Sequence, residues 1–244
     1  MRAPLYLIPG TMCDARLWGR MLGHMPGVDT YHCDYSSADT MDGMCDAVLD
    51  QAPDTSCHLV GFSLGGYLAI MAALREPGTF KSLTIIAASP YGLTDSEKAL
   101  RKRNAEMLTR MTYKGMSKAR LAQFVNADHL DDEAITGSIL QMERDLGQEV
   151  LIRQLIAPIE RVNIADDLLA LDLPVTFIMA TDDQLVPIGA IEKLAAKSAN
   201  ISLHLMSSTG HMIPFEAPEA LEHFPITLSH IRQRRNSSGM SRAE

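Results

Sequence analysis

The sequence predicts an α/β fold built on a mostly parallel sheet, and three observations support that prediction. Strand-like and helix-like stretches alternate along most of the 244 residues, which is the pattern of βαβ units. Residues 83–88 form a nearly continuous apolar run, as expected of a central strand covered on both faces. A strand-like run also ends in Gly61-Phe62-Ser63-Leu64-Gly65 and passes directly into a helix-like run. The length suits one large domain or two small ones.

The first part of the chain supplies alternating strands and helices. Residues 4–8 are apolar and lie between proline and Pro-Gly, which indicates a buried strand. Asp14 is suited to cap a short helix at residues 14–22. Met41, Met44 and Val48 recur at helical spacing. The predicted strands are residues 4–8, 28–33, 57–62 and 83–88, and the predicted helices are 14–22, 39–51 and 64–74.

The pattern changes after the strand at residues 83–88. No strand is evident between residues 94 and 161, and helical segments predominate, so we predict a helical insertion there. Alternation then resumes, and the polar tail of residues 232–244 is expected to be disordered. The predicted helices of the insertion are 95–112, 117–125, 132–146 and 147–157; strands follow at 175–180 and 201–206, and helices at 188–199 and 218–231, the last broken near Pro225.

Composition excludes several classes of protein. The hydrophobic fraction of 46% and charged fraction of 21% are ordinary for a globular chain, and the net charge of -8 argues against a nucleic-acid binder. No apolar run approaches the ~20 residues that cross a bilayer, and the N-terminal run is too short for a signal peptide, so we expect no membrane partner and a cytoplasmic location. Oligomeric state is not predicted. Buried free thiols, not a disulfide or a metal site, are expected of Cys13, Cys33, Cys45 and Cys57.

The Gly-x-Ser-x-Gly stretch is the strongest chemical signal. A strand that ends there and turns at once into a helix forms a nucleophile elbow. The turn is tight enough that Gly61 and Gly65 must lack a Cβ, and it presents the hydroxyl of Ser63 beside a helix N-terminus. The alternative is a glycine-rich turn with a solvated serine.

A serine hydroxyl needs a base, and the base needs a group to orient it. Asp182 and Asp183 follow the strand at residues 175–180, and either carboxylate could orient a histidine while the other caps a turn. His211 follows the strand at residues 201–206, in the chain order Ser, Asp, His. An oxyanion hole also requires two N–H donors, for which we expect the backbone of Leu64 and Thr11.

These motifs resemble those of the α/β-hydrolase superfamily, and in particular a group of small bacterial esterases that includes the pimeloyl-carrier-protein methyl ester esterases. Leu7-Ile8-Pro9-Gly10-Thr11 matches the oxyanion loop, with Pro9 in place of the usual histidine, so the loop geometry is expected to differ. Residues 61–66 match the elbow, residues 183–187 the acid loop and residues 210–219 the histidine loop. The resemblance favours Asp183 over Asp182 as the acid. It also implies about six strands, because the chain starts at the strand that carries the oxyanion loop.

The resemblance implies a serine hydrolase that cleaves carboxylic esters through an acyl-enzyme, with Ser63, His211 and Asp183 as the catalytic triad. It assigns residues 1–93 and 162–231 to the core and 94–161 to a lid. No metal or organic cofactor is implied. The expected partner is a small-molecule ester or a carrier-bound acyl group. Alternatives on the same scaffold are a lyase, a thioesterase, a C–C bond hydrolase and, more remotely, a non-catalytic small-molecule binding protein.

The insertion contains two further groups of residues. A thioether-rich substrate pocket is one interpretation of its methionines and of those in the loops, and ordinary helix packing is the other. The pocket candidates are Met12, Met107, Met111, Met142 and Met212. The insertion also carries many cations, which form either a solvated face or a docking surface for an anionic substrate. These are Arg101, Lys102, Arg103, Arg110, Arg144, Arg153 and Arg161.

Overall fold

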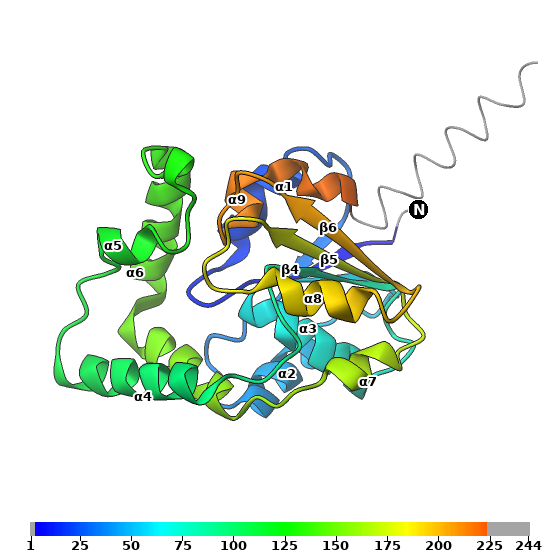
Figure 1. Ribbon diagram of the computed structural model, residues 1–244, viewed down its shortest axis with the longest axis horizontal. Helices are drawn as coiled ribbons and strands as arrows, with labels where there is room; N and C mark the ends of the chain where they lie inside the picture. Colours follow the sequence, from blue (N-terminus) through cyan, green and yellow to red (C-terminus); the bar gives the residue numbers. More distant parts are fainter. Residues whose placement is uncertain (1–2, 224–244) are drawn as a thin grey trace, which may run out of the picture.

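The protein forms a six-stranded parallel sheet in a computed structural model that describes residues 3–223. The strand order is β2-β1-β3-β4-β5-β6, with every neighbouring pair parallel. Figure 1 shows the arrows of β5 and β6 pointing toward the same end of the molecule. The strands are β1 (Leu5–Ile8), β2 (Thr30–His32), β3 (His58–Phe62), β4 (Ser82–Ile86), β5 (Val175–Ala180) and β6 (Ile201–Met206).

Both faces of the sheet are buried, because successive side chains of a strand point to opposite faces. In β1, Tyr6 and Ile8 belong to one hydrophobic core, whereas Leu5 and Leu7 belong to the other. Every residue of β4 is buried, which confirms the central strand predicted from its apolar run. The sheet therefore lies between two layers of helices.

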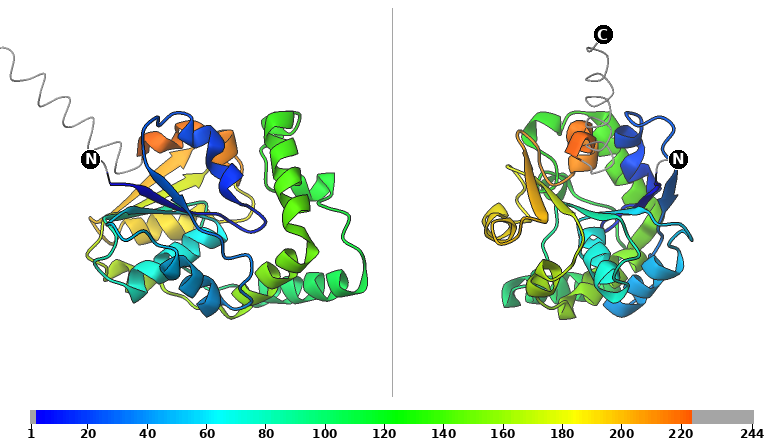
Figure 2. Two further views of the ribbon diagram at one scale, coloured as in Figure 1. Left: turned by 180° about the vertical axis from the view of Figure 1, so that it is seen from behind. Right: turned by 90° about the vertical axis from the view of Figure 1, so that its right-hand side faces the viewer.

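Figures 1 and 2 show the two layers on opposite faces of the sheet. The first layer packs against Tyr6 and Ile8 and comprises α2 (Met41–Asp50), α3 (Leu64–Arg75), α7 (Ala165–Leu169) and α8 (Ile188–Ala195). The second packs against Leu5 and Leu7 and comprises the 3-10 helix η1 (Ala15–Trp18), α1 (Gly19–Leu22), α9 (Ile213–Glu216) and η4 (Pro218–His223).

The segment of residues 94–161, between β4 and α7, is helical and projects from the end of the sheet toward which the strands point (Figures 1 and 2). Its first helix begins with a capping box in which Thr94 and Glu97 exchange hydrogen bonds. Its longest helix is interrupted at Gly147, where φ is 78°, so it behaves as two helices, as predicted. The elements are α4 (Asp95–Arg110), α5 (Lys118–Leu121), η2 (Ala127–His129), α6 (Glu133–Ile156) and η3 (Ala157–Glu160).

Several boundaries differ from those predicted. The helix expected at residues 14–22 is a 3-10 turn followed by one α-helical turn, because Asp14 caps the N–H of Arg16 and tightens the start. The helix expected at 117–125 ends at Leu121, and α7 was not predicted. The predicted last helix is the 3-10 helix η4 as far as His223; the rest of it, with the tail of residues 232–244, lies outside the described residues.

The prediction of buried free thiols is confirmed for Cys13, Cys33, Cys45 and Cys57. None of the helices within residues 3–223 combines the length and apolar character needed to cross a bilayer. Within the same residues, His, Cys, Asp and Glu side chains form no group of three or more arranged to hold a metal ion.

Candidate active site

Ser63 occupies the turn between β3 and α3 with φ 52° and ψ -118°, a left-handed conformation that is uncommon for a residue with a Cβ. The residues two positions before and after it must lack a side chain. A Cβ at Gly61 would lie 2.3 Å from the Gly65 carbonyl oxygen, and a Cβ at Gly65 would lie 2.2 Å from that of Pro9. The elbow is therefore packed so closely that glycine is required at both positions, as the sequence spacing predicts.

His211 lies in the loop between β6 and α9 and connects Ser63 to Asp183. Its Nε2 is 3.0 Å from Ser63 Oγ, and its Nδ1 is 2.8 Å from Asp183 Oδ2. An ionised carboxylate only accepts hydrogen bonds, so Nδ1 carries the imidazole proton and Nε2 is free to accept the serine hydroxyl. The ring packs between Phe62 and Phe124, with centroid distances of 5.1 and 5.8 Å. This packing fixes the imidazole plane.

The structure separates the two adjacent carboxylates that follow β5. The side chain of Asp183 is fully buried, and its second oxygen accepts the N–H groups of Leu185 and Val186 at 2.7 and 3.2 Å. Asp182 is exposed, and its carboxylate accepts a hydrogen bond from the amide of Asn126 at 3.0 Å. Only Asp183 is placed to orient the histidine.

The loop that follows β1 lies directly over the elbow. A Cβ at Gly10 would lie 3.1 Å from the Ser63 Cβ, so the backbone approaches the serine closely there. Within residues 3–223, neither Thr11 N–H nor Leu64 N–H donates to another protein group. Leu64 begins α3, so its N–H also carries the positive end of the helix dipole. Neither of the two predicted oxyanion donors is therefore used by another group within the described residues.

Gln154 fixes this loop from the insertion, a contact that sequence analysis did not identify. Its buried side chain extends from α6, and its Oε1 accepts the N–H of Met12 at 2.8 Å. Met12 has a φ of 56°, so the hydrogen bond holds a backbone conformation that a side chain disfavours. In the sequence, Gln154 stands out only as a polar residue within a largely apolar helical pattern, which does not predict that it binds Met12.

Glu216, at the end of α9, was also missed. It is buried, and its carboxylate accepts the N–H groups of Asn126, Gly210 and Met212 at 2.7, 3.1 and 3.0 Å. Burial raises the pKa of this carboxyl, while the backbone donors act in the opposite direction. The Glu216 carboxylate thus binds the residues on both sides of His211 and one residue of the insertion. An acidic residue inside an apolar stretch close behind the histidine is the signal that could have found it.

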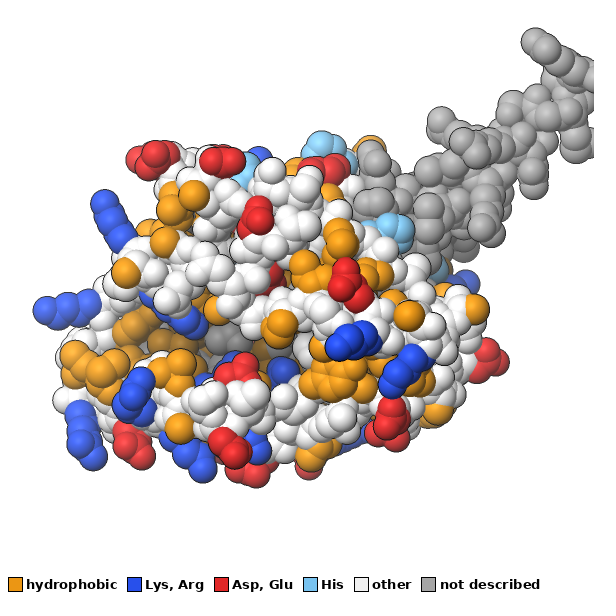
Figure 3. All heavy atoms as spheres, viewed as in Figure 1, with side chains coloured by type: hydrophobic (Ala, Val, Ile, Leu, Met, Phe, Trp, Pro, Cys, Tyr) orange, Lys and Arg blue, Asp and Glu red, His pale blue; other side chains and the backbone are white. Residues whose placement is uncertain are grey.

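The predicted pocket methionines fall into two groups. Met12, Met142 and Met212 are buried, and the last two share the hydrophobic core that contains Phe62. Met107 and Met111 lie on or next to α4 and are 52% and 53% exposed. Figure 3 shows apolar side chains gathered over the insertion, next to a hollow between it and the rest of the molecule.

The cations of the insertion also divide by location. Lys102, Arg103, Arg110 and Arg144 are exposed, whereas Arg101, Arg153 and Arg161 are partly buried. Burial lowers the pKa of Arg101 and of Arg161, and their mutual charge adds to the effect on Arg101. The sequence pattern does not distinguish these groups, because their burial depends on how the helices of the insertion pack.

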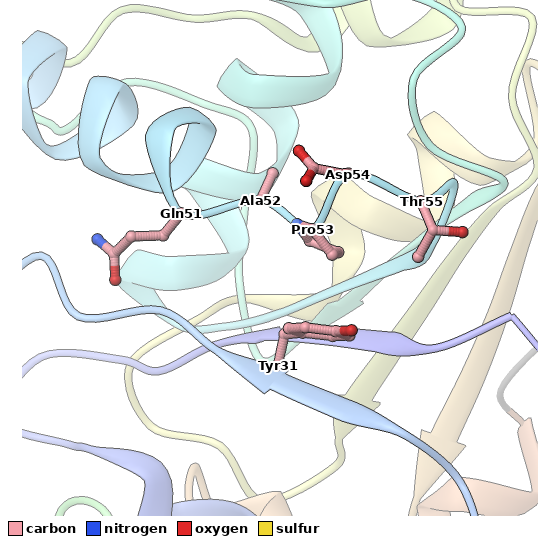
Figure 4. A pocket seen from close by; sticks show the side chains of 6 residues that line it. All are labelled: Tyr31, Gln51, Ala52, Pro53, Asp54 and Thr55. Atoms are coloured by element: carbon pink, nitrogen blue, oxygen red, sulfur yellow. The ribbon is translucent and has the colours of Figure 1, made fainter.

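A separate surface pocket is lined by Tyr31 of β2 and by residues 51–55 (Figure 4). Those residues form the loop that enters β3, at the opposite end of the strand from Ser63. This pocket is therefore not part of the site around Ser63.

Comparison with known proteins agrees with this architecture. A protein family described as alpha/beta hydrolase fold matches residues 26–218. The biotin biosynthesis bifunctional protein BioHC of Cellvibrio japonicus is 23% identical over 90% of the chain, which spans only 46% of that longer protein. The pimeloyl-[acyl-carrier protein] methyl ester esterase of Aeromonas hydrophila is 26% identical over 69% of the chain and 70% of its own length.

A solved structure of a thermophilic esterase from Thermogutta terrifontis superposes with a TM-score of 0.80 at 19% identity, covering 96% of this chain and 90% of the other. At that identity the likeness shows the fold. Together with the family match, which extends over most of the sequence, it identifies the chain as a member of the α/β-hydrolase family.

Proposed function

We propose that this protein is a serine hydrolase that cleaves carboxylic esters through an acyl-enzyme intermediate. The observation that supports the proposal best is the hydrogen-bonded series Ser63, His211 and Asp183, at 3.0 and 2.8 Å. The relatives include named esterases, and membership of a hydrolase family is consistent with this chemistry.

In the proposed reaction, Ser63 Oγ attacks the ester carbonyl carbon while His211 Nε2 takes the hydroxyl proton. The imidazolium then gives that proton to the leaving alcohol oxygen, and the alcohol departs. Asp183 holds the Nδ1–H and stabilises the positive charge on the ring. Water, deprotonated by the same Nε2, then attacks the acyl carbon. The bond to Ser63 Oγ breaks, the acid is released, and the imidazolium returns its proton to the Ser63 oxygen.

The Thr11 and Leu64 N–H groups would bind the carbonyl oxygen as its negative charge develops. Both belong to backbone held in place before the substrate arrives: Thr11 precedes the residue bound by Gln154, and Leu64 starts a helix. Such fixed donors stabilise the transition state without a reorganisation cost.

We assign residues 94–161 to a lid over this site. Met12, Met142 and Met212 are the candidates for lining the pocket under it, because they are buried beside the loops that carry the site. Met107 and Met111 are half-exposed, so they are not assigned to the pocket. The natural partner in this proposal is a small-molecule ester, or the ester of a carrier-bound acyl group.

Hydrolysis of p-nitrophenyl esters from acetate to dodecanoate tests the proposal. We expect turnover by the wild type and the loss of nearly all of it in Ser63→Ala, with Ser207→Ala, an exposed serine, as the control. A trapped acyl adduct on Ser63, detected by mass, would separate ester hydrolysis from a lyase reaction. Turnover that survives in Ser63→Ala would refute the mechanism.

A further inference from the structure

Two partly buried arginines of the insertion form no ion pair with a carboxylate of the described residues. Arg101 is on α4, and Arg161 follows η3. Within residues 3–223, no Asp or Glu oxygen lies within ion-pair distance of either guanidinium. Arg16, Arg20, Arg75 and Arg153 do form such pairs. In a protein with a net charge of -8, unpaired guanidinium groups away from full solvent need an explanation.

Each guanidinium is held by neutral contacts that leave most of its donors unused. Arg161 Nε donates to the Tyr91 carbonyl at 3.0 Å, and its guanidinium lies 4.8 Å from the centre of the Tyr67 ring. Arg101 Nη1 donates to the Gln154 carbonyl at 3.4 Å. A guanidinium has five N–H donors, so each side chain is positioned but not satisfied.

Each arginine is connected, through one intervening residue, to an element that carries the site around Ser63. Tyr67 is one helical turn beyond Ser63 on α3, and Arg161 stacks on its ring. Gln154, whose carbonyl accepts from Arg101, binds Met12 of the loop over the serine. Figure 3 shows Lys and Arg side chains around the hollow between the insertion and the rest of the molecule.

The local charge balance indicates what kind of anion would fit. Arg101 and Arg161 interact electrostatically with each other and with Glu97. The Glu97 carboxylate is already engaged by the N–H and hydroxyl of Thr94, both at 2.7 Å. Arg120 also acts on Arg101, and Glu143 in turn acts on Arg120. Three guanidiniums and two carboxylates leave one net positive charge. A singly charged anion neutralises it, whereas a phosphate dianion would exceed it.

We propose that Arg101 and Arg161 form a subsite for a carboxylate carried by the substrate of the Ser63 site. The subsite rests on the proposed ester hydrolysis and specifies its substrate as an ester with a second, free carboxylate. Guanidiniums bind carboxylates through paired N–H donors, and a partly buried location strengthens that bond relative to water.

Matched pairs of esters test the subsite on either side of the scissile bond. One pair is the mono-p-nitrophenyl ester of adipate against p-nitrophenyl hexanoate. The other is 4-(hexanoyloxy)benzoate against its methyl ester. We expect the charged member of one pair to have the higher kcat/KM, and we expect Arg101→Gln and Arg161→Gln each to lower that charged-to-neutral ratio by about 10- to 100-fold.

The control is Arg103→Gln, which removes a charge from the exposed side of the same helix and should leave the ratio as in the wild type. If Arg161→Gln does not fold, Arg161→Lys replaces it as the test, because lysine keeps the charge and the aliphatic stem. Arg161→Lys should lower the charged-to-neutral ratio less than Arg161→Gln does. The subsite is refuted if neither charged ester is preferred, or if the preference persists in both arginine variants.

Binding to Ser63→Ala separates this inference from the proposed reaction. Monomethyl adipate and 4-hydroxybenzoate serve as calorimetric probes, with and without Arg161→Gln. If no ester is hydrolysed but a probe binds in an Arg161-dependent way, the subsite stands and ester hydrolysis is wrong. If neutral esters are hydrolysed through Ser63 and neither probe shows this dependence, the reaction stands and the subsite is wrong.

Discussion

The carboxylate of Glu216 accepts the backbone N–H of Asn126 at 2.7 Å, across a sequence separation of 90 residues. The same side chain binds the N–H groups of Gly210 and Met212, which flank His211. A Cβ at Gly210 would lie 2.6 Å from the Asn126 nitrogen, so the histidine loop and the insertion are in close contact there. The position of the insertion and that of the histidine are therefore linked through one buried carboxylate.

Glu216→Gln should weaken this link. Glutamine has one acceptor oxygen, so its NH₂ group would face an N–H donor and at least one hydrogen bond would be lost. We expect a loss of about 1–3 kcal/mol of stability in urea unfolding and a fall in kcat larger than any change in KM. Glu219→Gln, at an exposed position in η4, is the control. An unchanged kcat in a destabilised Glu216→Gln protein would show that the carboxylate supports the fold alone.

The adjacent carboxylates after β5 offer a matched pair of variants. Asp183→Asn should lower kcat by about 10³- to 10⁴-fold, because an amide no longer selects the imidazole tautomer with Nδ1 protonated. Asp182→Asn alters an exposed side chain and should change kcat by about twofold or less. Steady-state kinetics on one p-nitrophenyl ester measures both. Equal losses in the two variants would contradict the assignment of Asp183.

Gln154→Leu should lower kcat by about tenfold, because it frees the N–H of Met12 in the loop over Ser63 and leaves that donor without its partner. Gln148→Leu is the matched control: Gln148 also lies on α6 and accepts a backbone N–H, but from Tyr113 within the insertion. The comparison of kcat between the two variants checks the prediction. A larger loss in Gln148→Leu would mean that α6 acts through overall stability.

Gly65→Ala should destabilise the protein by about 1–3 kcal/mol or prevent folding, because its Cβ would come within 2.2 Å of the Pro9 carbonyl oxygen. Gly137→Ala introduces a Cβ into open space within α6 and should stabilise by about 0.5–1 kcal/mol. Thermal and urea unfolding measure both changes in stability, which we expect to be opposite in sign. A stable Gly65→Ala protein would mean that the elbow can relax away from the loop after β1.

The cysteines should not react with thiol reagents while the protein is folded. Burial raises the pKa of Cys13 to about 12 and that of Cys33 to about 11, and the reactive thiolate is therefore rare at pH 8. Titration with Ellman's reagent should show almost no reaction in buffer and four thiols per chain in guanidinium chloride. Rapid labelling of the native protein would reveal an opening of the core.

Local spacing was sufficient for much of the fold and for part of the site. The elbow was predictable because Gly61, Ser63 and Gly65 lie within five residues of sequence, although the contact that requires glycine at position 65 is with Pro9 of the loop after β1. The helical insertion was predictable because alternation stops between β4 and β5. The helix expected at residues 14–22 is a 3-10 helix only in its first part, Ala15–Trp18, which Asp14 caps; Gly19–Leu22 is α-helical.

Tertiary structure decided what local spacing left open. Asp182 and Asp183 are equivalent as residues after a strand, and only the path of the histidine loop brings one of them to His211. Gln154 binds Met12 across a sequence separation of 142 residues, and helical periodicity cannot predict such a contact. Helical spacing also did not show which methionines are buried: Met142 is buried, whereas Met107 is exposed.

The sequence by itself determined the order of strands and helices, the glycine-dependent turn at Ser63 and the types of side chain that carry the chemistry. The packing of distant segments determined which of those side chains meet, which arginines lack a carboxylate partner within residues 3–223 and which carboxylate holds the histidine loop. The physical reason is range: steric and helical constraints act over a few residues, whereas the partner of a buried polar group depends on how the whole chain folds.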